Sequence, residues 1–362
     1  MDGIDAVLAD FEPASPRVLS AQTIAFDDVI QAELASARND PHQFPAGRLV
    51  RLDAQLGDAF GQAALSVIEE AGVSKETVLA IGSHGQTILH DPDHVPPGTL
   101  QIGDPHRIAA CTGVLTVADF RRADLAAGGQ GAPLAPLLHQ ALLANPDENR
   151  AVVNLGGIAN LTLLTTDGGI SGFDTGPANC LLDDWYRRHH HGRFDNSGAW
   201  AACGQVDEAW LGTLLNDDYF SRPAPKSTGI ETFSPGWLDR RLPAWAPERP
   251  ADIQATLMAA TVETLAQAIE RLPAGQRPAL VIACGGGVHN RTLMDRLGHR
   301  LAPTPVKDSA DFGLNPDHIE ALLFAWLARE RLANRPVDTR LITGASRPVL
   351  AGSLFPGANG LV

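Results

Sequence analysis

The sequence predicts an α/β protein of two domains, and three observations support this prediction. The chain has 362 residues, which is more than one hydrophobic core usually serves. Residues 151–176 alternate apolar runs with glycine-containing turns, as paired β-strands do. Residues 279–297 pass from an apolar run through three glycines into a helical pattern, which is typical of a strand-turn-helix unit.

Composition and charge exclude several classes of protein. The net charge of −14, from 28 basic and 42 acidic residues, argues against nucleic acid or an anionic membrane as a partner. No signal-peptide pattern occurs, and no apolar run approaches the roughly 18 residues of a spanning helix. The four cysteines stand far apart, which excludes a zinc ribbon and favours a reducing compartment. We therefore expect a soluble, cytoplasmic protein without a bound structural metal.

The first third of the chain predicts a polar loop after a buried strand. Residues 4–11 read as a strand, and residues 53–71 place apolar side chains on one helical face. A short strand at 78–81 leads into a loop that carries His84, Gln86 and Thr87. Such loops often contact ligands, although a lone histidine is more often structural.

A second strand, within residues 114–122, ends in charged side chains. Asp119 and Arg121 are either ligand contacts or members of a surface ion network. Glycines at 128–133 then precede a helix at 134–143, and this segment is equally well read as a hinge or as a ligand loop.

Residues 151–176 hold the central motif. One apolar run enters Asn154 and the pair Gly156-Gly157, a second follows to Leu164, and a turn at 167–169 returns the chain to Asp174. A hairpin accounts for the glycines of the turn, but a glycine pair inside a strand pattern indicates that another group approaches the backbone closely. Phosphate binding with a carboxylate at the strand end and a plain hairpin both remain open.

The last third predicts a second glycine-rich turn. Asp252 is expected to cap a helix that runs to about residue 272. The apolar run 279–284 enters Gly285-Gly286-Gly287 and then Asn290, a pattern that favours nucleotide binding over a purely structural turn. Glu320, near the start of a helix at 321–332, is either a ligand contact or a capping partner of Asp317. Residue patterns alone thus lead to a two-domain α/β protein that transfers phosphoryl groups.

Eight motifs, in order along the whole chain, resemble those of the anhydro-N-acetylmuramic acid kinase family. They are GSHGQT at 82–87, ADFR at 118–121, GGQGAP at 128–133, NLGGIAN at 154–160, FDTGP at 173–177, DIQATL at 252–257, CGGG at 284–287 and TGAS at 343–346. The resemblance implies the actin, sugar-kinase and Hsp70-ATPase fold, in which two ribonuclease-H-like lobes close around ATP and Mg²⁺ at an interdomain active-site cleft. The expected lobes are residues 1–125 with 338–362, and residues 126–337.

The resemblance also implies a reaction and roles for residues. Family members open the anhydro ring of 1,6-anhydro-N-acetylmuramate with water and phosphorylate O6 with ATP, in the recycling of cell-wall peptidoglycan. Asp174 would be the general base. The implied nucleotide contacts are Asp2, Gly3, Asp5, Asn154, Gly156, Gly157, Asn160, Gly285, Gly286, Gly287 and Asn290. The implied sugar contacts are His84, Gln86, Thr87, Asp119, Arg121 and Glu320. A homodimer is a further implication.

The chain departs from the family at its start. Family members carry a strand and a Gly-Thr-Ser phosphate loop immediately before the segment that appears here as residues 1–5. Either the natural start lies upstream of Met1, or the chain is truncated and holds ATP poorly. The rival functions are a non-catalytic sugar- or nucleotide-binding remnant and another sugar kinase of the superfamily, which would deprotonate a sugar hydroxyl without needing water.

Overall fold

The chain is a mixed α/β protein with two compact units. The computed structural model describes residues 3–12, 16–224 and 226–357. Unit 1 comprises Met1–Leu138 with Glu320–Val362, and unit 2 comprises His139–Ile319. The units therefore divide after residues 138 and 319, whereas the expected lobes divided after 125 and 337. Residues 320–337 belong to unit 1 because the helix that they mostly form packs against its strands.

The described residues of unit 1 form three small sheets. Strands β1 (Gly3–Asp10) and β2 (Arg17–Ala25) form an antiparallel pair. A three-stranded sheet has the order β12 (Ser353–Phe355), β6 (Thr116–Ala118) and β3 (Ile81–Gly82), while β4 (Gln86–Asp91) pairs with β5 (Gly98–Ile102). The strand expected at 78–81 is thus shorter and later, at Ile81–Gly82.

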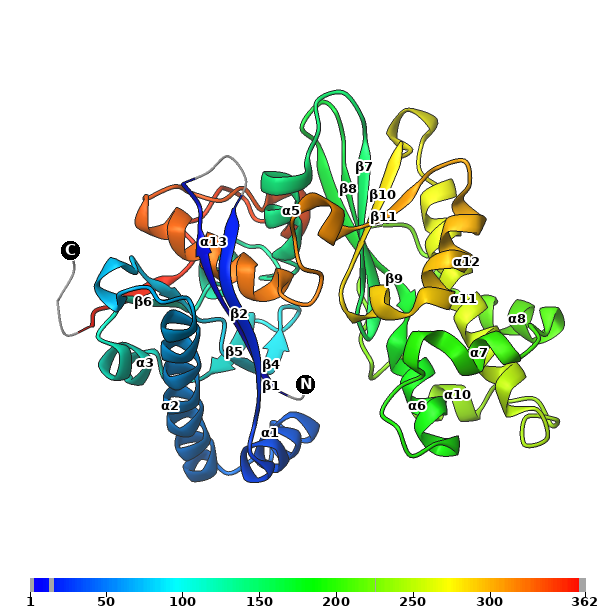
Figure 1. The fold of residues 1–362 in the computed structure, drawn as a ribbon, viewed down its shortest axis with the longest axis horizontal. Helices are drawn as coiled ribbons and strands as arrows, with labels where there is room; N and C mark the ends of the chain where they lie inside the picture. Colours follow the sequence, from blue (N-terminus) through cyan, green and yellow to red (C-terminus); the bar gives the residue numbers. More distant parts are fainter. Residues whose placement is uncertain (1–2, 13–15, 225, 358–362) are drawn as a thin grey trace. The chain divides into compact units, whose positions relative to one another are not determined.

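Helices enclose these sheets. The long α2 (Ala46–Glu70) begins earlier than the sequence pattern indicated and contacts both β1 and β2 (Figure 1). The other helices of unit 1 are α1 (Asp28–Asn39), α3 (Pro105–Thr112), α4 (Arg122–Ala126), α13 (Ile319–Leu332) and α14 (Arg340–Thr343). Helix α5 (Ala135–Leu143) contains the first boundary between the units.

Unit 2 is built on one five-stranded sheet. Its order is β11 (Val306–Asp308), β10 (Leu280–Cys284), β7 (Arg150–Leu155), β8 (Ile158–Leu164) and β9 (Ile170–Pro177). β7, β10 and β11 are parallel, whereas β7–β8 and β8–β9 are antiparallel hairpins. The hairpin prediction for residues 151–176 is confirmed.

Helices cover the apolar face of this sheet. The longest, α11 (Pro250–Glu270), is buried along most of its length and contacts β8 and β9, and α12 (Arg291–Leu301) packs beside it (Figure 1). The remaining helices are α6 (Asn179–His189), α7 (Ala199–Cys203), α8 (Glu208–Leu215), α9 (Asp218–Ser221) and α10 (Pro235–Asp239).

The prediction that Asp252 caps the long helix is wrong. The helix begins two residues earlier, at Pro250, with Arg249 in the cap position. The Asp252 carboxylate instead accepts a 2.7 Å hydrogen bond from the Gln205 N–H and pairs with Arg249. Proline is favoured in the first helical turn, which explains why the start lies at residue 250.

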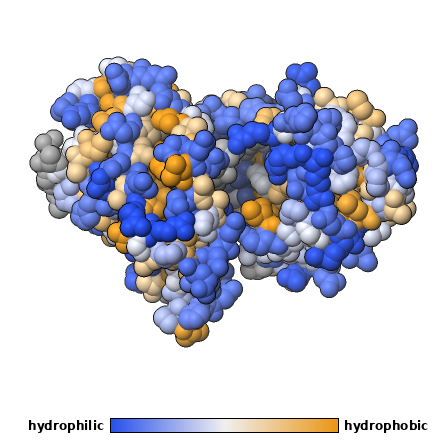
Figure 2. All heavy atoms as spheres, turned by 90° about the horizontal axis from the view of Figure 1, so that it is seen from below, coloured by the Kyte–Doolittle hydropathy of each residue, from blue (hydrophilic) through white to orange (hydrophobic). Residues whose placement is uncertain are grey.

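Polar residues predominate on the face in Figure 2, where apolar residues occur as separate spots and small groups. No helix among the described residues is both long and apolar enough to cross a membrane.

Candidate functional site

Three polar residues that the sequence singled out lie in one row across the sheet of unit 2. Asn154 of β7 is paired with Asn160 of β8, and Asn160 is paired with Asp174 of β9. Directly opposite residues of neighbouring strands project from the same face of a sheet. Register therefore brings together groups that are up to 20 positions apart in the sequence.

Asp174 is held from three directions. Its N–H donates to the Lys226 carbonyl at 3.0 Å, and its own carbonyl accepts from the Tyr219 hydroxyl at 2.7 Å. One carboxylate oxygen accepts from the Thr228 N–H at 2.9 Å. Burial raises the pKa of the half-buried Asp174 carboxyl, while the Thr228 hydrogen bond opposes this rise. A fixed carboxylate with a raised pKa is suited to accept a proton.

The loop that holds Asp174 is itself anchored by Lys226. The Lys226 ammonium donates to the carbonyls of Tyr219 and Phe220 at 3.0 and 3.3 Å, and it lies 4.6 Å from the centre of the Tyr219 ring. Sequence reasoning missed Thr228 and Tyr219 as supports of Asp174. No local pattern marks them, because they contact Asp174 from 54 and 45 residues away.

The two glycine-rich turns of unit 2 lie side by side. Cys284 at the end of β10 is paired with Asn154 near the end of the parallel strand β7. Both turns therefore follow the carboxyl ends of neighbouring strands. Gly285 has a φ of +79°, and a Cβ there would clash with the Asn154 side chain. The Asn179 side chain donates to the Leu155 carbonyl at 2.9 Å, and the Asn179 N–H donates to Gly156 at 3.0 Å.

Packing distinguishes the members of the triple glycine. A Cβ on Gly287 would meet the Leu155 side chain, so Gly285 and Gly287 both have structural reasons to be glycine. Gly286 has no positive φ, and beyond its neighbours in the chain no protein atom lies within 4 Å of the place of a Cβ. Gly286 is therefore the position with open backbone. Asn290 caps α12, since its side chain accepts from the Leu293 N–H at 3.0 Å.

In unit 1, Arg121 joins the polar loop after β3 to the glycine loop that follows β6. Its Nε donates to His84 Nε2 at 3.0 Å, and its Nη1 donates to the Gly131 carbonyl at 2.8 Å. His84 also stacks on Phe324, with ring centres 4.3 Å apart. Burial, followed by the charge of Arg121, lowers the pKa of His84 to about 3, so the imidazole is neutral at physiological pH.

Glu320 adds a carboxylate to this neighbourhood. Desolvation raises the pKa of Glu320, the positive charge of Arg121 opposes the rise, and the charge of Asp5 adds to it. The Asp317 carboxylate contacts His289 at 2.8 Å, and the Asp317 N–H donates to the Asn315 side chain at 3.0 Å. Asp5 accepts from the Thr23 hydroxyl at 2.6 Å.

The other predicted residues of unit 1 have contacts of their own. The Thr87 hydroxyl accepts from the Gln101 side chain at 3.3 Å at the start of β4, where Gln86 also lies. Asp119 has a left-handed φ of +60° and pairs with Arg122 at 3.3 Å, so an ion pair of the expected kind forms there, whereas Arg121 bonds to His84 and Gly131.

Two of the predicted nucleotide contacts are at the start of the chain. Gly3 packs against the Ile24 carbonyl, and Asp2 lies outside the described residues.

A family model described as anhydro-N-acetylmuramic acid kinase matches residues 1–357 of the chain. A protein of that name from Xanthomonas campestris is 50% identical over 98% of this chain and 94% of its own length. Another from Xylella fastidiosa is 47% identical over 98% of this chain and 93% of its own. A third from Shewanella woodyi is 43% identical over 99% and 96%.

These matches define first the class of the protein, which is a phosphotransferase of mixed α/β fold. More particularly, the chain belongs to the anhydro-N-acetylmuramic acid kinase family. The match from end to end favours a kinase over a non-catalytic remnant.

Proposed function

We propose that the protein opens the ring of 1,6-anhydro-N-acetylmuramate with water and transfers the γ-phosphoryl group of ATP to O6. The products are N-acetylmuramate 6-phosphate and ADP. Family membership supports the reaction class, and the observation that carries the mechanism is the held, half-buried carboxylate of Asp174.

In the proposed reaction, Asp174 accepts one proton from the attacking water. Water attacks the anomeric carbon while Asp174 takes its proton, and the bond from that carbon to O6 breaks. The freed O6 then forms a bond to the γ-phosphorus as the bond to the ADP oxygen breaks. The Thr228 N–H fixes the direction of the accepting carboxylate, and the Tyr219 hydroxyl fixes its backbone. A positioned base of this kind typically contributes about 10²–10⁴-fold to the rate.

We assign the phosphates of ATP to the glycine turns of unit 2. The open backbone of Gly286 and the turn at Gly156-Gly157 offer N–H groups, and Asn154 and Asn160 project beside Asp174. Backbone N–H groups at such turns bind anions without needing a basic side chain. This suits a chain whose net charge is −14.

We assign the sugar to unit 1. Neutral His84, the Arg121 guanidinium and the Glu320 carboxyl group offer donors and acceptors of different kinds to hydroxyl, amide and carboxylate groups. Gln86, Thr87 and Asp119 extend this set.

Mg²⁺ is expected with ATP. This ion usually keeps several waters and needs only one or two protein carboxylates beside the phosphates, which is compatible with the lack of a three-ligand cluster among the described residues. The exposed carboxylate of Asp5 fits that role. When bound, the ion neutralises charge on the transferred group. A cytoplasmic location, a homodimer, and unit 1 and unit 2 as the two lobes complete the proposal.

The test is an ADP-release assay with ATP, Mg²⁺ and the anhydro sugar. We expect turnover by the unaltered chain, a loss of at least about 100-fold in Asp174→Asn, and unchanged ATP affinity by calorimetry. Asp295→Asn, an exposed aspartate of α12, is the matched control. Near-normal turnover in Asp174→Asn would contradict the assignment.

Two further outcomes separate the rival functions. Preference for the open, reducing sugar over the anhydro sugar would favour another sugar kinase. A folded chain that binds ATP and sugar but releases no ADP would favour the binding remnant.

A further inference from the structure

Unit 1 buries a carboxylate that the proposed reaction does not use. Asp124 of α4 is 1% exposed, and its carboxylate accepts hydrogen bonds from three groups, all of them neutral. One oxygen accepts from the Gly131 N–H at 2.7 Å, and the other accepts from the hydroxyl groups of Thr343 and Thr339. A buried carboxylate costs free energy unless hydrogen bonds or opposite charges compensate it. Asp124 therefore indicates a specific requirement for the groups that it holds.

The same carboxylate joins two motifs of the sequence, the GGQGAP loop at 128–133 and the TGAS turn at 343–346. The Gln130 N–H of the loop donates to the Thr343 carbonyl of the turn at 3.0 Å. A Cβ on Gly129 would lie 2.3 Å from the carboxylate and 2.7 Å from the Thr343 hydroxyl, so the loop backbone packs directly against both groups. These contacts fix the GGQGAP loop within unit 1, which favours a ligand loop over a hinge.

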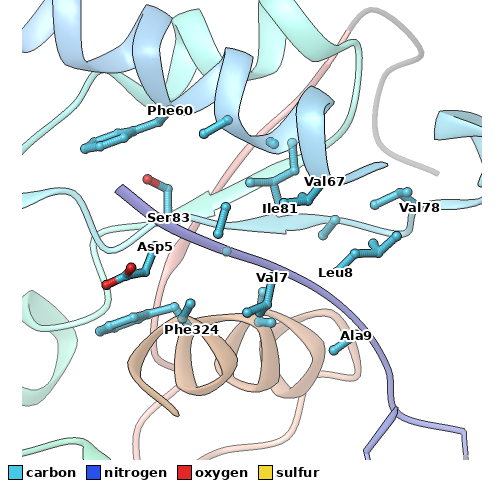
Figure 3. A pocket seen from close by; sticks show the side chains of 18 of the residues that line it. Asp5, Val7, Leu8, Ala9, Phe60, Val67, Val78, Ile81, Ser83 and Phe324 are labelled. Atoms are coloured by element: carbon cyan, nitrogen blue, oxygen red, sulfur yellow. The ribbon is translucent and has the colours of Figure 1, made fainter. Parts of the chain in front are cut away.

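The fixed loop in turn holds Arg121. The Gly131 carbonyl accepts from Arg121 Nη1 at 2.8 Å, and the N–H of the same glycine is the one that Asp124 binds. Arg121 Nε then donates to His84 at 3.0 Å. His84 stacks on Phe324 of α13, which lines a cavity of about 700 Å³ that β1 and β3 also border (Figure 3). A chain of contacts thus runs from the buried carboxylate to the proposed sugar contacts.

The charge of Asp124 adds to this effect. Burial lowers the pKa of Arg121, and the negative charges of Glu320 and Asp124 oppose that change. Both carboxylates therefore compensate part of the cost of desolvating the guanidinium. Among the described residues, the contacts with Gly131 and His84 use Nη1 and Nε of Arg121, which leaves its Nη2 group for a ligand.

We propose that Asp124 is a positioning residue for sugar binding, which acts through the Gly131 backbone to hold the Arg121 guanidinium in its binding orientation. The inference rests on the proposed contact between Arg121 and the sugar. It also gives the GGQGAP loop and the TGAS turn a shared purpose, because together they enclose the carboxylate that holds Arg121.

Calorimetric titration with 1,6-anhydro-N-acetylmuramate tests the proposal, because it measures affinity whether or not the sugar is turned over. Asp124→Leu replaces the carboxylate by an apolar group of similar size and should raise the dissociation constant of the sugar about tenfold. Asp124→Asn keeps an oxygen for the Gly131 N–H, so its increase should stay below about threefold. The affinity for ATP, which is assigned to unit 2, should be unchanged in both variants.

Thr339→Val is the matched control for a purely structural effect. It removes a hydrogen bond from the other oxygen of Asp124 and leaves the Gly131 bond in place. The unfolding temperature should therefore fall, while the dissociation constant of the sugar should change less than about twofold. Gly129→Ala provides a second route if Asp124→Leu does not fold. It keeps the charge but displaces the carboxylate, and an increase of about tenfold is expected there too.

A double-mutant cycle separates this inference from the proposed function. In the Arg121→Lys background, Asp124→Leu should raise the dissociation constant of the sugar by less than about twofold further, because the side chain through which Asp124 acts is already altered. Full additivity, or equal losses of affinity in Asp124→Leu and Thr339→Val, would overturn the inference and leave the sugar assignment in place. An unchanged sugar affinity in Arg121→Lys would overturn both.

Discussion

The Thr228 N–H donates a 2.9 Å hydrogen bond to a carboxylate oxygen of Asp174. The two residues come from a strand and from a loop 54 positions later. This bond stabilises the charged form of a carboxyl group whose burial favours the neutral form, so it tunes the proposed base.

The pH dependence of kcat/KM should reflect this balance. A base must be deprotonated, so activity falls as pH falls through the pKa of Asp174, which lies above the ordinary value of 3.8. Thr228→Pro removes the N–H and should move the acidic limb to higher pH, whereas Thr228→Ala keeps the N–H and should leave the limb in place. Identical limbs in both variants would show that this bond does not tune the base.

Gly286 and Gly285 give a pair of alanine variants that separates binding from folding. The methyl group of Gly286→Ala meets no protein atom beyond the neighbouring residues of the chain, so the variant should keep its unfolding temperature while the KM for ATP rises. Gly285→Ala forces a Cβ at φ +79° into Asn154 and should lower stability by about 1–3 kcal/mol. Denaturant unfolding and ATP titration check both. An unchanged KM in Gly286→Ala would remove this turn from the nucleotide site.

Arg121 and Arg122 are neighbours with different surroundings. Arg121→Lys cannot keep both the bond to His84 and the bond to Gly131, so the KM for the sugar should rise about tenfold, equivalent to about 1.4 kcal/mol. The more exposed Arg122, paired with Asp119, serves as the control, and Arg122→Lys should change KM less than about twofold. Steady-state kinetics with varied sugar tests this. Equal changes of KM in the two variants would show that the paired hydrogen bonds of Arg121 have no specific part in sugar binding.

His139 should make stability depend on pH. It is buried, with one ring nitrogen 3.0 Å from the Thr162 hydroxyl, and burial lowers its pKa from 6.5 to about 4. Because the folded pKa lies below the unfolded one, its contribution is fully present above about pH 6.5 and is lost as pH falls toward 4. Between pH 7 and 5 this loss amounts to about 2 kcal/mol.

Urea denaturation at the two pH values tests this expectation. His139→Leu should show a smaller loss of unfolding free energy on acidification than the unaltered chain. His299→Leu, at an exposed site on α12, should retain the full loss. An unchanged loss in His139→Leu would mean that other groups account for the acid sensitivity.

Local patterns predicted much of the fold. Alternating apolar runs and turn glycines located the hairpin of β8 and β9, and the apolar run with three glycines located β10 and its turn. The ends of the helices were less predictable. Helix α11 begins at Pro250, and the Asp252 carboxylate contacts Gln205 and Arg249 rather than capping the helix. Asn290 likewise proved to cap a helix, a role that its place after the glycines did not reveal.

By itself, the sequence determined the class of fold, the family and the candidate residues, because motifs and periodicity are local properties of a chain. Only the tertiary structure decided that Asn154, Asn160 and Asp174 share one row, since strand register sets which residues lie opposite each other. It also decided that Thr228 and Tyr219 hold Asp174, and that β1 and β3 border a cavity. These relationships join residues that are far apart in the chain, and hydrogen bonds and packing specify them only once the chain has folded.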